Sequence, residues 1–123
     1  MNLSELFQKA GFGIFASAGA DGSVNTAIYA RPRVIDEKTL VWGMTDGRSF
    51  RNVSLNPRAS YLFKEDGHGF RGVRLGLERF KVEGGGEMLE AIRKNTAEVV
   101  SPAAGKAVTH AVWFRVVEVR ALV

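Results

Sequence analysis

The chain has 123 residues, of which 46% are hydrophobic and 24% are charged, as in an ordinary globular domain rather than a disordered or fibrous chain. It contains no cysteine, which excludes disulfides, thiolate metal sites and cysteine nucleophiles. The net charge of +4 permits association with phosphates, nucleic acid or acidic surfaces without choosing among them. We expect one domain that spans residues 1–123.

The first residues predict a short amphipathic helix, because Leu3, Leu6 and Phe7 recur at helical spacing and Gly11 follows. This segment has no basic stretch followed by an apolar run, so it does not resemble a signal peptide. No apolar stretch approaches the length of a membrane-spanning helix. We therefore expect a cytoplasmic protein that does not bind membranes.

Six later segments are rich in β-branched and aromatic residues and predict strands: 12–18, 24–33, 39–44, 58–63, 71–83 and 111–123. Pro32 cannot donate to a strand ladder, so the far end of the second strand should lie at a sheet edge or leave the sheet. The alternation of apolar and polar residues slips near Glu78, which predicts a bulge. Helical spacing returns at 87–99, and 101–106 is expected to be a loop. Together these segments predict a small β-barrel with inserted helices.

The segment 43–57 combines a strand end, a glycine turn and a short helix that carries Arg48 and Arg51. Asn56 and Pro57 stop this helix, because a residue before proline disfavours the helical conformation. Backbone amides and the helix dipole favour anions at a helix N-terminus, so the segment predicts a phosphate site. Arg48 can donate a forked pair of hydrogen bonds, and the Ser49 hydroxyl can fill a remaining phosphate oxygen.

Four stretches in order carry a resemblance to a known superfamily: Asp21-Gly-Ser-Val-Asn-Thr26, Leu40-Val-Trp42, Arg48-Ser-Phe-Arg-Asn-Val53 and Asn56-Pro-Arg-Ala-Ser60. They resemble the pyridoxamine 5′-phosphate oxidase-like, FMN-binding split-barrel superfamily, most clearly over residues 12–83. The resemblance implies a mainly β fold, a six-stranded antiparallel split β-barrel. Its short helices are expected at the N-terminus, after the third strand and before the last strand. The chain is similar to short, single-domain flavoprotein members.

The resemblance also implies a homodimer that holds FMN between its subunits. The implied phosphate contacts are Arg48 and Ser49, with Asn52 on the following turn. Met44 and Thr45 would lie beside the ribityl chain. The strand along the isoalloxazine edge would contribute Asn25, Thr26, Ala27, Ile28 and Tyr29. Arg51 either joins the phosphate site or faces solvent or the partner subunit. Trp113 would be a core or interface residue that can reach the partner's flavin site, because the last strand of small members lies close to the dimer interface.

Several functional interpretations remain open at this point. The first is an FMN-binding oxidoreductase or electron carrier of unidentified substrate, in which the flavin carries the redox chemistry. The second keeps the fold but binds F420 or haem, and haem would favour His68 or His110. The specialised C-terminal motif of true pyridoxamine 5′-phosphate oxidases is not apparent, so we do not expect that enzyme.

A third interpretation is a non-catalytic module whose basic strand meets nucleic acid. Its arginines and lysine would be Arg71, Arg74, Arg79 and Lys81, with Phe70 and Phe80 as stacking residues. We favour a solvated strand face with two core aromatics, and expect no nucleic-acid partner. No carboxylate lies at metal-ligand spacing from either histidine, so we also expect no metal site.

Overall fold

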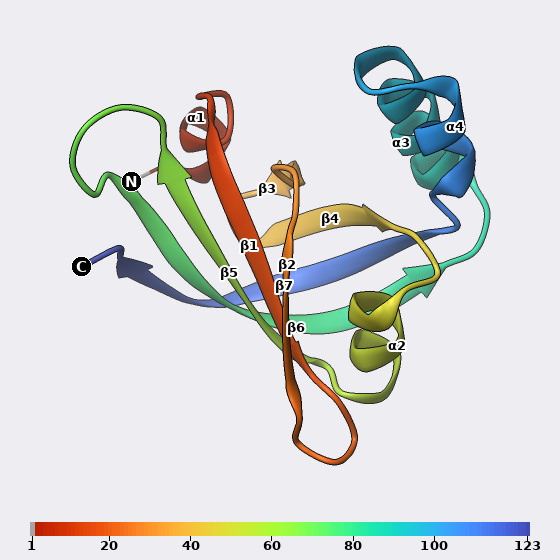
Figure 1. Cartoon of the computed structure of the whole chain (residues 1–123), viewed down its shortest axis with the longest axis horizontal. Coiled ribbons are helices and arrows are strands. Elements are labelled where there is room, and N and C mark those ends of the chain that lie inside the picture. Colours follow the sequence, from red (N-terminus) through yellow and green to blue (C-terminus); the bar gives the residue numbers. More distant parts are fainter. Residues whose placement is uncertain (1) are drawn as a thin grey trace.

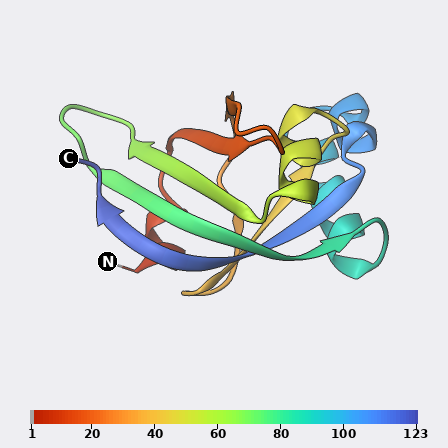
Figure 2. The same cartoon turned by 90° about the horizontal axis from the view of Figure 1, so that it is seen from below.

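The computed structural model describes residues 2–123, which form one seven-stranded antiparallel sheet and four short helices (Figure 1). The strands are β1 (Gly11–Ala18), β2 (Val24–Ile28), β3 (Arg33–Asp36), β4 (Thr39–Met44), β5 (Arg58–Glu65), β6 (Gly72–Glu83) and β7 (His110–Ala121). The helices are α1 (Leu3–Leu6), α2 (Arg48–Leu55), α3 (Glu87–Val99) and α4 (Pro102–Ala107). The strand order is β2-β1-β5-β6-β7-β4-β3. Figure 2 shows the long strands β6 (green) and β7 (blue) running side by side and curving across the molecule.

The predicted count of six strands is wrong, and the sheet does not close into a barrel. The segment 24–33 forms two strands, because β2 ends at Ile28 and β3 begins at Arg33. Pro32 lies in the connection, where its missing N–H and fixed φ interrupt strand pairing as predicted. β3 then pairs with β4 instead of continuing along β1, so β2 and β3 become the two outer edges of the sheet.

Side chains from the interior hold the corner between β2 and β3. The Tyr61 hydroxyl lies 3.1 Å from the carbonyl oxygens of both Tyr29 and Ala30 and can donate to either. Trp42 Nε1 donates to the Ala30 carbonyl at 2.9 Å. Gly13 passes so close to the Tyr61 hydroxyl that a Cβ atom at this position would overlap it. The corner is therefore fixed by residues distant in sequence.

Most other predicted elements are confirmed. The strand at 39–44 and the helix at 87–99 have the predicted bounds. The pairing of β6 with β7 shifts register between Gly76 and Leu77 and again after Arg79, on either side of the predicted bulge near Glu78. These shifts bend the two longest strands and so help the sheet to curve.

The predicted loop at 101–106 is instead the helix α4. The Ser101 side chain caps this helix by accepting a hydrogen bond from the Ala104 amide at 3.0 Å, and Pro102 occupies the first turn. Gly105 packs against α3, where a Cβ would come within 2.7 Å of the Arg93 carbonyl oxygen. In the sequence Gly105 suggested a loop, but in the structure its lack of a side chain allows α4 to pack closely against α3.

Aromatic side chains fill the interior of the curved sheet. Phe15, Trp42, Tyr61 and Phe114 are buried, and neighbouring ring centroids lie 4.8–5.6 Å apart. α1 closes one end of this core by burying Leu3 and other apolar residues, as predicted for a packing helix. Within residues 2–123 there is no helix long and apolar enough to span a membrane.

Candidate functional site

The two outer edges of the sheet are β2 and β3, and β3 pairs with β4 only at residues 39–41. We call the seam the region formed by the unpaired edge of β2 together with residues 42–49, which lie beyond that pairing. Two contacts mark its ends. Trp42 reaches the Ala30 carbonyl beyond the end of β2, and Asn25 Nδ2 donates to Ser49 Oγ at 3.4 Å near its start. The seam therefore brings the strand predicted to lie along the flavin next to the segment predicted to hold its phosphate.

The unpaired edge of β2 carries free backbone groups. The Tyr29 amide donates to the Gly13 carbonyl, so Tyr29 and Gly13 form a hydrogen-bonded pair of the β1–β2 ladder. Backbone groups alternate in direction along an antiparallel strand, so those of Thr26 and Ile28 point away from β1. β2 has no strand partner on that side. These amides and carbonyls are free to bind a planar heterocycle with donors and acceptors along its rim.

The helix α2 begins at the other side of the seam. Its N-cap is Gly47, and no side chain caps the helix. The first amide bonded back to the cap is that of Arg51, which donates to the Gly47 carbonyl at 3.0 Å. The amides of the first turn, from Arg48 to Phe50, precede it and are the donors that a helix start leaves free. An anion placed here meets these amides and the positive end of the helix dipole.

The Arg48 side chain is exposed beside these amides. None of the five ion pairs found within residues 2–123 includes it. Thr45 and Asp46 are exposed in the same turn, and Asp46 is its one carboxylate. The Arg48 guanidinium is therefore available to supply charge-assisted donors to an anion.

Four of the predicted site residues, Asn25, Tyr29, Ser49 and Asn52, point toward the interior of the curved sheet. Ser49 is only 6% exposed, and its hydroxyl accepts from Asn25. Burial raises the pKa of Tyr29, and a hydrogen bond with Ser49 acts in the opposite direction. Asn52 Nδ2 donates to Ser17 Oγ at 3.1 Å. These side chains bind α2 to β1 and β2, so an anion at α2 would meet Ser49 through its backbone amide.

The other predicted residues divide between exposed and buried positions. Thr26 and Ile28 are exposed on the outer side of β2, whereas Ala27 is half-buried. Met44 is buried, and its carbonyl accepts a hydrogen bond from the Thr109 amide at 2.9 Å. The buried Met44 side chain contributes to the core, so only its backbone borders the seam.

A cleft of about 340 Å³ lies at the end of the seam, between the β2–β3 corner, β4 and α3. Its lining includes Arg31, Arg33, Asn95 and Thr96, and among residues 2–123 no acidic side chain lines it. The sequence analysis missed these four residues. The repeated arginine around Pro32 was a signal, but only the fold brings α3 to the same place.

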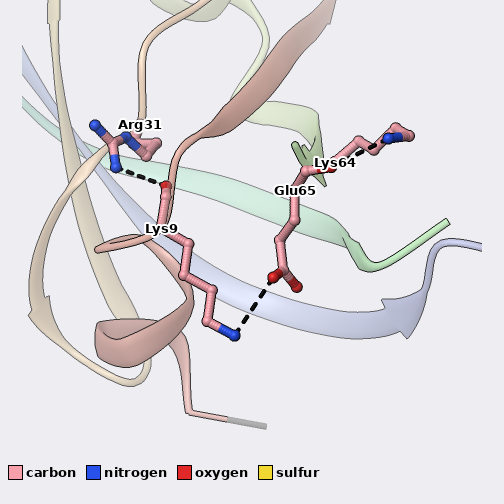
Figure 3. A network of polar contacts seen from close by, with 4 residues as sticks. All are labelled: Lys9, Arg31, Lys64 and Glu65. Carbon is pink, nitrogen blue, oxygen red and sulfur yellow. Dashed lines mark hydrogen bonds and ion pairs between the residues drawn. The ribbon is translucent and has the colours of Figure 1, made fainter. Parts of the chain in front are cut away.

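The Arg31 side chain is held by hydrogen bonds to the residues that follow α1. Its Nη1 donates to the carbonyl oxygens of Phe7 at 3.3 Å and Lys9 at 2.6 Å. Lys9 in turn pairs with Glu65 at 3.3 Å, and Lys64 Nζ donates to the Glu65 carbonyl (Figure 3). These contacts fix the position of Arg31 at the cleft.

Three residues of the predicted basic stripe, Arg74, Arg79 and Lys81, have local partners. Arg74 Nε donates to the Ala121 carbonyl and Arg79 Nε to the Val53 carbonyl, both at 2.9 Å. Phe70 and Phe80 were expected in the core, but they are 68% and 43% exposed, so that expectation is wrong. Phe80 lies at the second register shift of β6, which explains its outward position.

Arg51 and Trp113 lie apart from the seam contacts described above. Arg51 is exposed on α2. Trp113 is half-buried, and its Nε1 donates to Glu83 Oε1 at 2.6 Å. Lys81 Nζ lies 4.7 Å from the centroid of the Trp113 ring. Within the chain, therefore, the Trp113 indole contacts two side chains of β6.

Comparisons with known proteins agree at the level of fold. No family model and no curated protein sequence matches the chain. Among solved structures, an FMN-binding protein from Syntrophomonas wolfei subsp. wolfei has a TM-score of 0.84 at 13% identity, over 99% of this chain and 84% of that one. A candidate pyridoxamine 5′-phosphate oxidase from Listeria innocua has a TM-score of 0.76 at 15% identity, over 98% and 94% of the two chains.

Two further structures of the same fold are named for other ligands. An F420 reductase has a TM-score of 0.74 at 15% identity, over 95% of this chain and 94% of that one. The heme storage protein HutZ from Vibrio cholerae has a TM-score of 0.67 at 17% identity, over 98% and 95%. The chain thus has the fold of the pyridoxamine 5′-phosphate oxidase-like split-barrel superfamily, as the four sequence stretches predicted.

Proposed function

We propose that the protein binds FMN at the seam as a homodimer and acts as an oxidoreductase or electron carrier. The observation that carries the proposal is the unpaired backbone edge of β2 facing an uncapped helix start that bears Arg48. A flavin needs both parts, because its ring has donors and acceptors along one edge and its phosphate is an anion. The FMN-binding protein of the same fold supports this choice of ligand.

In this proposal each side of the seam has a distinct task. The amides at the start of α2 and the Arg48 guanidinium would hold the phosphate, and Thr45 would contact the ribityl chain. The backbone of Thr26 and Ile28 would bind the edge of the ring. The bound flavin would supply the redox chemistry by accepting and giving electrons, while the chain orients it and limits its contact with water.

The first experiment is an absorption spectrum of the purified protein, with and without added FMN. We expect a flavin spectrum, and an Arg48→Ala variant should bind FMN about ten- to a hundredfold more weakly, because a charge-assisted hydrogen bond contributes about 1.5–3 kcal/mol. Arg58→Ala is the matched control, since its exposed side chain pairs with Glu78 on another surface. Protein that neither retains nor takes up FMN would refute the proposal, and equal losses in both variants would remove Arg48 from the site.

F420 and haem are the alternatives that the same fold accommodates in its solved neighbours. Mass spectrometry of the released cofactor distinguishes F420 from FMN, and an intense absorption band identifies haem. For haem, His110 is half-buried and its ring stacks on Phe50 with centroids 4.2 Å apart, whereas His68 is exposed in the β5–β6 loop. A haem spectrum that disappears in one histidine variant would replace the flavin proposal.

A further inference from the structure

The last part of β7 has a strand partner on one side only. β7 pairs with β4 up to Arg115, whereas its pairing with β6 continues to Ala121. The Val116 amide makes the last contact on the β4 side, where it donates to the Lys38 carbonyl at 2.8 Å. We call residues 117–121 the free edge, because no strand within residues 2–123 pairs with them on the side away from β6.

The free edge lies apart from the candidate flavin site. Figure 1 shows this end of β7 at the C-terminus, on the side of the molecule away from α2, α3 and α4, and Figure 2 shows the same separation from a second direction. A groove of about 270 Å³ runs beside the free edge, lined by residues 116–119 together with Leu3, Glu37 and Lys38. A chain that docks here would therefore leave the seam uncovered.

The residues of the free edge favour pairing with another extended chain. All five are exposed, and Val117 and Val119 are apolar residues of high strand propensity that are 46% and 52% exposed. Unpaired strand edges are templates for further pairing, and proteins commonly block them with proline, with lysine or by keeping the edge strand very short. The free edge contains neither proline nor lysine. It is therefore open to a further strand.

The two sides of the free edge differ in chemistry. Val119 lies opposite the buried core residue Leu75, so it points to the core side of the sheet. Its neighbours Glu118 and Arg120 point to the other side, because side chains alternate along a strand. They form an ion pair at 3.3 Å and are both more than half exposed. One side of the free edge is thus apolar, while the other carries one charge of each sign.

These two charges select a register for a second copy of the same strand. Residues directly opposite one another in an antiparallel pair lie on the same side of the sheet and interact. A twofold axis at Val119 would place Glu118 of each copy opposite Arg120 of the other. An axis at Glu118 or at Arg120 would instead place like charges opposite each other, which is unfavourable. A shift by one residue would turn the core side of one copy to the outer side of the other.

This charge complementarity favours a second copy over an unrelated extended chain. An isologous contact presents the same residues from both chains, so each copy supplies the arginine that the glutamate of the other requires. The same register brings the Val119 side chains of the two copies together on the core side. Pairing would therefore bury apolar surface, satisfy free backbone groups and join opposite charges at once.

We propose that two copies of the chain pair antiparallel along the free edge of β7, with the twofold axis at Val119. The two sheets then become one continuous sheet that runs β6-β7-β7-β6 through the contact. This edge-to-edge contact is distinct from the homodimer at the seam and does not rest on the proposed function. Where both contacts form, the free edge joins one homodimer to another.

The test is disulfide cross-linking of the full chain, which contains no cysteine of its own. In Val119→Cys the two thiols would lie opposite each other across the axis, where Cα atoms are about 4.5–5.5 Å apart and a disulfide can form. Val99→Cys is the matched control, because Val99 is 74% exposed but lies at the end of α3. On non-reducing gels after mild oxidation, we expect Val119→Cys to form the two-chain band at least about tenfold faster, because pairing raises the effective concentration of the thiols. Circular dichroism checks that both variants fold.

A charge exchange in the Val119→Cys background tests the register. Glu118→Arg replaces two pairs of opposite charges with two pairs of like charges, so it should slow cross-linking by about tenfold. Adding Arg120→Glu exchanges the two charges, restores both pairs and should restore the rate.

Three results would overturn the proposal: equal rates for Val119→Cys and Val99→Cys, no effect of Glu118→Arg, or no recovery with Arg120→Glu. With equal rates, the free edge would be left to an extended segment of another protein. Visible absorbance of the same samples tests the flavin separately. Fast cross-linking of colourless Val119→Cys protein supports the edge contact and refutes the flavin, whereas yellow protein without selective cross-linking does the reverse.

Discussion

The two sides of the seam differ in how firmly they are built. β4 pairs with β3 on one side and β7 on the other, and its residues Leu40, Val41, Trp42 and Met44 are buried. β2 pairs only with β1, and none of its five residues is buried. The β4 side is therefore part of the core, while the β2 side is an edge held at its ends by side chains.

From this difference we expect the two sides to contribute differently to the proposed binding. Stability within a protein is uneven, and segments with few buried contacts open at lower free energy than core strands. β4 sets the position of the turn that leads to α2, so the phosphate end of the proposed site is rigid. We therefore expect any adjustment to a ligand at the proposed site to occur in β2 rather than in β4.

The largest expected effect is on the β4 side. Trp42→Ala removes a side chain that packs against Phe15, Tyr61 and Phe114 and donates to the Ala30 carbonyl. We expect the free energy of unfolding to fall by about 3–5 kcal/mol, as for other large-to-small aromatic changes in cores. Chemical denaturation followed by circular dichroism measures this change.

The matched change on the β2 side is Ile28→Ala. Its side chain is 74% exposed, so we expect a change within about 0.5 kcal/mol for the monomer. Chemical denaturation of both variants, followed by circular dichroism at the same protein concentration, measures the two changes side by side. Similar losses for Trp42→Ala and Ile28→Ala would contradict the contrast between the two sides.

A smaller effect is expected from Tyr61→Phe, which tests the hold on the β2–β3 corner. The variant keeps the aromatic packing but removes the hydroxyl within hydrogen-bond reach of the Tyr29 and Ala30 carbonyls. We expect a global loss of about 0.5–1.5 kcal/mol, the usual net contribution of a hydrogen bond. Hydrogen exchange should show a larger loss of protection at the Tyr29 amide, which bonds to Gly13, than in β4. Equal loss in both strands would show that the corner does not hold β2 separately.

The same contrast explains which parts of the fold were predictable from sequence. β4 and α3 have regular local patterns of apolar residues, and their predicted bounds are those observed. The segment 24–33 reads locally as one strand, but the corner that divides it depends on Tyr61, more than thirty residues from Tyr29 in sequence. Local periodicity does not contain that information, so β3 was missed.

The candidate site shows the same limit. The segment around Arg48 was recognisable because a glycine turn, a helix start and an arginine are adjacent in sequence. The direction of the Ser49 hydroxyl could not be predicted in this way, because its hydrogen-bond partner Asn25 comes 24 residues earlier in the sequence. The cleft residues Asn95 and Thr96 read as ordinary helix positions until α3 is placed beside β4.

A further small effect is expected at α1, which is held at both ends by residues that flank β3. Arg31 bonds its C-terminal end, whereas Glu37, in the β3–β4 turn, accepts hydrogen bonds from the Leu3 and Ser4 amides at its start. These bonds lower the pKa of Glu37 below its ordinary value. A carboxylate with a lowered pKa in the folded state contributes stability above its unfolded pKa of about 4.3, and loses it as pH falls through the folded value.

Glu37→Gln should therefore be slightly less stable than the unmodified protein at neutral pH, because an amide oxygen accepts the two backbone donors less strongly than a carboxylate. As pH falls below about 4.3 and Glu37 becomes protonated, the difference between the two proteins should shrink. Asp21 and Asp36 also have lowered pKa values, from hydrogen bonds with Ser23 and Lys38, but they are present in both proteins and cancel in the comparison. Thermal melts of both proteins across this pH range measure the difference. A difference independent of pH would show that Glu37 acts on α1 through packing rather than through the charge of its carboxylate.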